Sequence, residues 1–249
     1  MGHAILQTDQ SPIAAEQLAK AFMSIDRYAP ADGVKMARDS FGLIIDHLRA
    51  EEADRLSRAL GKVGVDTRVV SDDVLFTMPP VKTTKRFDCL ADHLLVYDAL
   101  GRPITLSWDQ VLVVAAGQVS LYEPKIIEVD RNAHSARGTD LPVTVTDRSI
   151  RGEEVPRLVL DLIVLGEPAR YRCEAQEMNY AYLADRQAGS VEGNFAVVLA
   201  DMVSFASAAT LNQGAVALLS DFENAFTYPS RKSFEREIVW LITSATLRQ

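Results

Sequence analysis

The first seventy residues switch between short apolar runs and helix-spaced apolar positions, a pattern typical of helices packed on a small sheet. Ser11 followed by Pro12 has the residue types of a helix N-cap and first turn, and Gly64 has those of a helix end. The expected elements are a strand over 3–8, a helix after Pro12, a helix over 31–39, a strand over 41–46, a helix over 49–64 and a strand over 65–70. This order, β-α-α-β-α-β, predicts a small α+β domain with helices on one side of its sheet.

A change of period separates two parts of the chain. Pro79 and Pro80 disfavour both a helix and a central strand, and polar residues follow them. Beyond them, apolar positions recur every second residue, which predicts an antiparallel sheet. Strands are expected over 86–90, 94–97, 104–108, 111–119, 125–129, 158–165 and 171–174, and C-terminal helices over 194–207, 215–226 and 234–245. We therefore predict a domain over residues 1–78, a linker over 79–86 and a β-rich domain with a helical C-terminal part over 87–249.

One segment, residues 130–157, matches neither period, and within it only residues 143–145 resemble a strand. Connections longer than about 15 residues are usually functional or mobile. We interpret this segment as a surface insertion in preference to a binding loop.

The charge balance excludes some partners. Basic residues number 26 and acidic residues 34, a net charge of −8. Residues 1–86 carry 12 of each sign, so the excess lies in residues 87–249, where 14 − 22 = −8. Such a surface repels phosphate, and the basic cluster Lys82, Lys85 and Arg86 is interpreted as solvated linker. We expect no nucleic-acid partner.

The cellular setting is inferred from what the sequence contains. The longest apolar runs, such as 111–117, are far shorter than the about 20 residues of a membrane helix, so no membrane partner is expected. The N-terminus has no basic and apolar leader, which favours a cytoplasmic location. Two cysteines, Cys89 and Cys173, are expected to be reduced and buried in preference to forming a disulfide.

The familiar motifs of cofactor and catalytic sites do not occur, including the glycine-rich nucleotide loops, His-Glu-x-x-His, Cys-x-x-Cys and Gly-x-Ser-x-Gly. No cofactor is therefore expected. Cys89 and His93 lie within five residues, but zinc or a nucleophilic pair needs converging ligands, and His3, His47 and His134 are the remaining histidines. A buried cysteine beside a surface turn is the preferred interpretation.

Tyr171, Tyr180, Tyr182 and Arg186 form the one local concentration of tyrosine and arginine. These residue types are enriched where protein interfaces are strongest. The preferred interpretation is that two of the tyrosines are half-buried core, and the group is the candidate interaction patch if the protein binds a partner.

Two resemblances extend the fold prediction. Residues 31–65, from Ala-Asp-Gly-Val-Lys to Lys-Val-Gly-Val, resemble the C-terminal domain of ribosomal protein L7/L12 and the related fold of the ClpS protease adaptor. The ribosomal family presents lysines on its short helix, where this chain has Ala31 and Val34 with Lys35 displaced, so no functional residue is transferred. Residues 87–249 resemble bacterial pleckstrin-homology-like domains, on the strength of 97–102 followed by 104–111.

These observations favour a non-enzymatic interaction or adaptor protein with a protein partner, since both resembled folds serve as docking surfaces. The alternative is an enzyme with a dispersed site in the interdomain cleft, built from residues such as His47, His93 and Glu123. A lipid-binding module is a third possibility, which the acidic second part of the chain argues against. The partner and the oligomeric state are left open.

Overall fold

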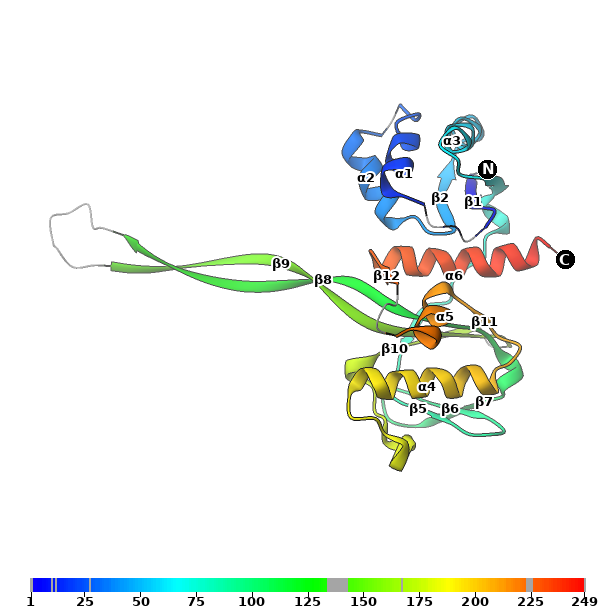
Figure 1. Cartoon of the computed structure of the whole chain (residues 1–249), viewed down its shortest axis with the longest axis vertical. Helices are drawn as coiled ribbons and strands as arrows, with labels where there is room; N and C mark the ends of the chain where they lie inside the picture. The colour runs from blue at the N-terminus through cyan, green and yellow to red at the C-terminus, as the bar shows by residue number, and fades with distance from the viewer. Residues whose placement is uncertain are drawn as a thin grey trace.

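The computed structural model describes residues 2–9, 11, 13–26, 28–133, 143–166, 168–222 and 226–248, with the backbone alone for residues 30, 123–133 and 143–151. These residues form an α+β fold with three sheets (Figure 1).

The N-terminal part is a three-stranded antiparallel sheet with three helices. Its elements are β1 (His3–Gln7), α1 (Ala15–Phe22), α2 (Pro30–Asp39), β2 (Leu43–Leu48), α3 (Ala50–Lys62) and β3 (Thr67–Ser71). The strand order is β2-β1-β3, which places β1 at the centre. Phe22, Leu56 and Leu60 are fully buried in the core between helices and sheet. The order of helices and strands along residues 3–71 is the predicted one.

The sequence indicates the end of α3 correctly and the start of α1 incorrectly. Gly64 follows α3 with φ +80°, the left-handed conformation that ends a helix at glycine. The predicted N-cap at Ser11 is wrong, because α1 begins at Ala15. The Ser11 amide donates to Asp9 Oδ1 (2.9 Å) in a turn, and Gln17 Oε1 accepts from the Ala14 amide (3.1 Å) at the helix start.

The remaining strands and α-helices of the described residues build two sheets and three α-helices. They are β4 (Val81–Thr83), β5 (Phe87–Cys89), β6 (Leu94–Tyr97), β7 (Pro103–Leu106), β8 (Val111–Ala133), β9 (Val143–Val164), β10 (Ala169–Glu174), α4 (Val191–Phe205), β11 (Thr210–Leu211), α5 (Gln213–Ser220), β12 (Thr227–Tyr228) and α6 (Arg231–Thr246). The large sheet has the order β11-β8-β9-β10-β4, with β12 also paired to β8. The small antiparallel sheet has the order β5-β6-β7.

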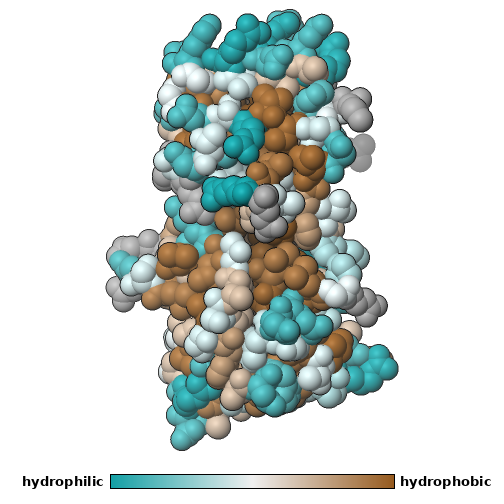
Figure 2. Space-filling model, turned by 90° about the vertical axis from the view of Figure 1, so that its right-hand side faces the viewer, coloured by the Kyte–Doolittle hydropathy of each residue, from teal (hydrophilic) through white to brown (hydrophobic). Residues whose placement is uncertain are grey.

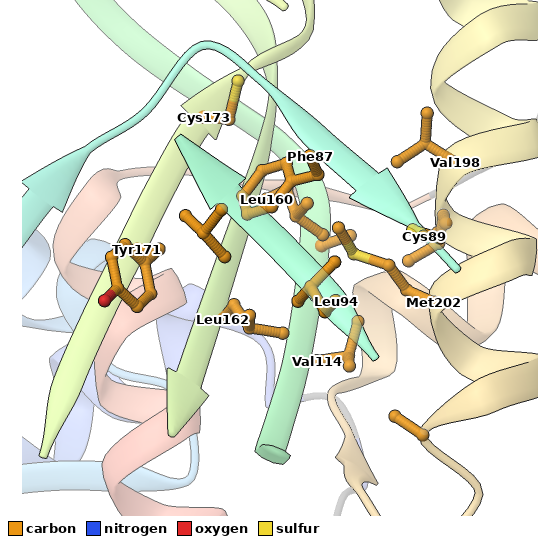
Figure 3. Packing of buried hydrophobic residues seen from close by; sticks show 14 of the residues in the cluster. Phe87, Cys89, Leu94, Val114, Leu160, Leu162, Tyr171, Cys173, Val198 and Met202 are labelled. Atoms are coloured by element: carbon orange, nitrogen blue, oxygen red, sulfur yellow. The ribbon is translucent and has the colours of Figure 1, made fainter. Parts of the chain in front are cut away.

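The large sheet buries both of its faces at the end where all its strands meet. Alternate residues of β8, such as Val114, enter a core shared with the small sheet and α4 (Figure 3). Their neighbours, such as Val113, enter a second core with Phe234 and Ile238 of α6. This two-residue alternation is what places two cores on one sheet.

Helix α6 lies between the N-terminal sheet and the large sheet (Figure 1). The predicted apolar stripe of this helix includes Phe234 and Ile238, which pack on the large sheet. The opposite side is buried as well, because Trp240 packs against β1 and β2 and donates from Nε1 to the Gln7 carbonyl at 2.7 Å. A helix covered on both sides joins the two halves of the chain into one body.

Two predictions about chain organisation are wrong. The predicted linker over 79–86 contains β4, which pairs in parallel with β10, and Thr84 is buried with its amide bonded to the Arg172 carbonyl at 2.9 Å. In the segment 130–157, where only residues 143–145 were expected to resemble a strand, residues 130–133 and 143–157 are paired strand of β8 and β9; residues 134–142 lie outside the described residues. In both places the segment forms a strand because its backbone pairs with another strand, and side-chain periodicity does not reveal such pairing.

Candidate functional site

The four residues of the predicted interaction patch differ in their exposure. Tyr171 on β10 is only 5% exposed and lies in the core shown in Figure 3. Tyr180 and Tyr182 are half-buried, and Arg186 is exposed. Tyr171 therefore cannot contact a partner in this fold, and its burial matches the preferred interpretation.

Tyr182 and Arg186 are joined through Asp201 of α4. The Tyr182 hydroxyl donates to Asp201 Oδ2 (3.0 Å), and the Arg186 guanidinium donates to both oxygens of the same carboxylate (3.0 and 2.8 Å). Burial, reinforced by Cys89 and Asp201, raises the pKa of the Tyr182 hydroxyl, which stays protonated. These bonds fix the short 3-10 helix Ala181–Arg186 against α4, which is a structural role.

Cys89 and His93 do not form a reactive pair. Burial raises the pKa of the Cys89 thiol to about 12, so the thiol is protonated and a poor nucleophile at neutral pH. His93 Nδ1 lies 2.8 Å from the Asp92 carboxylate. Within the described part of the chain, no three His, Cys, Asp or Glu side chains come together as a metal ion would require, and both cysteines are free and buried.

The residues of the alternative enzyme hypothesis are far apart in the fold. His47 is the next-to-last residue of β2 in the N-terminal sheet, with Nδ1 2.9 Å from Asp72 Oδ2. His93 lies in the turn between β5 and β6, at the other end of the body (Figure 1). Glu123 is on β8, and its side chain lies outside the described atoms. The structure does not bring His47 and His93 together.

The seam between the N-terminal part and the large sheet holds an apolar pocket of about 250 Å³. Phe41 and Phe226 line it, and their ring centroids are 5.5 Å apart. Arg38 is the one ionisable side chain among the described residues that line it, and it bonds to the Pro229 carbonyl (2.9 Å) and to Glu154 of β9 (2.7 Å). Among the described residues that line the pocket, Arg38 has no second ionisable group with which to share acid–base chemistry.

A second pocket, of about 440 Å³, lies beside the basic cluster of Lys82, Lys85 and Arg86. The prediction that this cluster is solvated linker is wrong for Arg86, which stacks on the Tyr97 ring (4.4 Å to its centroid) and bonds to both oxygens of Asp88 (2.8 and 2.7 Å). Lys85 pairs with Glu177 at 3.3 Å. The cations bordering this pocket are therefore already neutralised from within the chain.

Apolar side chains gather across the middle of the face shown in Figure 2, where the N-terminal sheet meets the rest of the body. The partly exposed apolar residues packed at this seam are Val70, Leu75, Phe76, Met78, Leu112, Val239 and Leu241. The band follows the edges of two cores.

The feature that sequence reasoning missed is a projecting ribbon. Beyond the body, β8 and β9 continue together as a two-stranded antiparallel ribbon (Figure 1), which we call the arm: residues 122–133 and 143–154. The pairing is regular from Val113↔Ile163 to Ala133↔Val143. The cue for the arm was the set of β-branched residues Ile126, Ile127, Val129, Val143, Val145 and Ile150.

Comparison of this chain with protein-family models, with curated proteins and with solved structures finds no match. In the described residues, no helix has the length and apolar character needed to cross a membrane.

Proposed function

We propose that the protein is a non-enzymatic interaction protein that contacts a protein partner through its arm. The single observation that carries this proposal is the arm itself, a pair of strands to which no other strand among the described residues is paired beyond the body. An isolated two-stranded ribbon is marginally stable in water, so a ribbon of this length is best explained by a surface that covers it.

The root of the arm supports the same function. Tyr122 is 70% exposed at the point where the arm leaves the body, and a tyrosine is well suited to anchor an interface. Glu154, opposite Tyr122 in the ladder, is held by Arg38 of α2 at 2.7 Å. This ion pair links the root of the arm to the N-terminal part.

We also propose the two fold resemblances as working hypotheses. The order β1-α1-α2-β2-α3-β3 supports the likeness of the N-terminal part to the L7/L12 C-terminal domain and ClpS. The small β5–β7 meander, followed by β8–β10 and then α4, supports the likeness of the second part to pleckstrin-homology-like domains. Both families act mainly by docking, which agrees with an interaction protein.

The test places a photo-activated cross-linking residue at Tyr122 of the full chain, produced in its native host. We expect covalent adducts with protein at this position, because the exposed ring lies at the root of the arm. The matched control carries the same residue at Lys62, an exposed position at the end of α3. Equal adduct formation at both positions, or none at Tyr122, would show that the arm is not the contact element.

A further inference from the structure

We propose that the apolar pocket at the seam binds a small carboxylic acid with an aromatic body, and that Arg38 holds the carboxylate of this ligand. The pocket is bounded by α1, by α2 and by the residues on either side of β12. Small-molecule sites lie preferentially where two parts of a protein meet. This site is separate from the proposed contact through the arm, so the two can be tested independently.

Two aromatic rings form one wall of the pocket. Phe41 lies just before β2 and Phe226 just before β12, and both side chains are half-buried. Their rings are tilted by 45°, and each packs on the buried ring of Tyr228, at centroid distances of 5.5 and 4.8 Å. The other apolar residues of the lining are Ile13, Ala15, Ala37 and Pro229. Because aromatic rings pack well on further rings, edge to face or offset, this wall favours a flat aromatic ligand.

The polar side chains of the lining are largely bonded within the chain. Gln7 accepts from the Gly42 amide at Oε1 (3.1 Å) and donates from Nε2 to the Ser11 carbonyl (2.7 Å). The Ser40 hydroxyl, which has a single proton, lies 2.7 and 2.8 Å from two backbone carbonyl oxygens. A ligand with many polar groups, such as a sugar, would therefore find few partners in this pocket.

Arg38 is the exception among these polar groups. Its Nε donates to the Pro229 carbonyl (2.9 Å), its Nη1 pairs with Glu154 (2.7 Å), and its Nη2 has no bond to the described residues. A guanidinium holds a carboxylate best through two parallel N–H bonds. The ion pair of Arg38 with Glu154 is open to solvent, since the two side chains are 42% and 50% exposed. A ligand carboxylate can therefore bind Nη1 and Nη2 together by displacing Glu154.

The charge of the lining selects the sign of the ligand. Arg38 is the one ionisable side chain among the described lining residues, so a cationic ligand would meet a like charge. An apolar ligand without a charge would fill the pocket but leave the guanidinium without a new partner. An aromatic acid satisfies both the rings and the guanidinium.

The volume limits the size of the acid. The pocket measures about 250 Å³, and an apolar cavity of about 150 Å³ is known to hold benzene. The extra space suits one ring with a short chain. With so few atoms in contact, and with a solvent-exposed cation, we expect a dissociation constant on the order of 0.1–1 mM.

The test is a ligand-observed NMR titration of the purified full chain with three probes. Phenylpropionate has both the ring and the acid, phenylpropanamide has the ring with an uncharged amide, and propionate has the acid alone. We expect phenylpropionate to bind most tightly, phenylpropanamide to bind more weakly, and propionate to show no saturation up to about 10 mM.

One variant tests the position of the site. Ala15 lines the pocket and is exposed, so Ala15→Trp fills the pocket without placing a large side chain in the core. We expect it to weaken binding of phenylpropionate at least about tenfold, because the ring loses its space. The matched control, Ala31→Trp, makes the same change at an exposed position near the start of α2 that does not line the pocket, and should bind like the natural chain.

Two further variants test the role of Arg38. Arg38→Gln should weaken phenylpropionate about tenfold and leave phenylpropanamide unchanged, so that the amide reports an intact pocket. Glu154→Gln removes the competing carboxylate, and we expect it to strengthen phenylpropionate at least about twofold without affecting the amide.

The contradictory outcomes are distinct. The absence of phenylpropionate binding, or equal binding by Ala15→Trp and Ala31→Trp, overturns the site. Equal affinity for phenylpropionate and phenylpropanamide, or loss of both in Arg38→Gln, overturns the assignment of an acid held by Arg38. Neither result affects cross-linking at Tyr122, which tests the arm alone.

Discussion

Arg236 and Glu237 are consecutive residues of α6 whose side chains bind opposite halves of the molecule. Arg236 Nη1 donates to the Ile44 carbonyl of β2 at 2.7 Å. Glu237 accepts from the Gln213 amide at 2.8 Å and from the Tyr228 hydroxyl, both beside the large sheet. One helix step thus connects the N-terminal sheet to the rest of the chain, and the direction of the arm relative to the N-terminal part depends on it.

The Arg236 contact can be tested by Arg236→Met. The variant removes the bonds to Ile44 and to Asp46 (3.2 Å) at a buried position, and bonds from a charged donor are worth about 1.5–3 kcal/mol. We expect urea denaturation to show a loss of about 1–3 kcal/mol in the free energy of unfolding. Lys232→Met, at an exposed position of the same helix, is the control and should change it by less than about 0.5 kcal/mol. An equal effect of both changes would mean that the seam does not depend on Arg236.

Glu237 should give the protein a characteristic pH dependence. Burial raises the pKa of its carboxyl in the fold, although the hydrogen bond from Tyr228 opposes this. The folded protein therefore binds the proton more tightly than the unfolded chain, whose carboxyl has a pKa of about 4.3. Its contribution to stability is complete below that pH and is lost as the pH rises through the folded pKa.

The measurement is the free energy of unfolding of the natural chain and of Glu237→Gln between about pH 4 and pH 8, on both sides of the ordinary carboxyl range. We expect the natural chain to lose stability relative to the variant as the pH rises. A constant difference across the range would contradict the raised pKa.

Two glycines with left-handed backbones offer a matched pair. Gly42 has φ +63°, and a Cβ there would lie 2.6 Å from the Trp240 ring, whereas Gly64 has φ +80° and no atom within 4 Å. Gly64→Ala should therefore cost only the backbone penalty, about 1–2 kcal/mol. Gly42→Ala should cost a further 1–3 kcal/mol or so, because Trp240 or the backbone must move. Thermal unfolding of the two variants measures the loss of stability in each. Equal losses would show that α6 does not pack this closely on the N-terminal sheet.

The two cysteines should be inert in the folded protein. Burial raises the pKa of both thiols, Cys89 and Cys173, to about 12. We expect iodoacetamide at pH 8 to modify neither thiol in the native protein within the time that labels both in urea, as read by mass spectrometry. Rapid native labelling of Cys89 would reopen a reactive role for that residue.

For the candidate site, the sequence indicated which residues to consider but not what surrounds them in the fold. It selected Tyr171, Tyr182 and Arg186 as candidate interaction residues, and the fold buries the first and bonds the other two to Asp201. The partner of Tyr182 lies 19 residues further along the chain, so no local pattern could identify it. The arm was missed because a two-stranded ribbon needs only backbone pairing, and apolar and charged residues do not alternate regularly along its two strands.

The sequence by itself determined the local elements and the charge balance. Apolar spacing with Gly64 defined α3, and alternation defined most strands, because these patterns act within a few residues. Only the tertiary structure decided that Val81–Thr83 pairs with β10, that β8 and β9 continue into an arm, and that α6 is buried on both sides through Arg236 and Trp240. Those outcomes depend on contacts between residues that are 10 to 233 positions apart. Burial in three dimensions sets these contacts, and the spacing of neighbouring residues along the chain does not predict them.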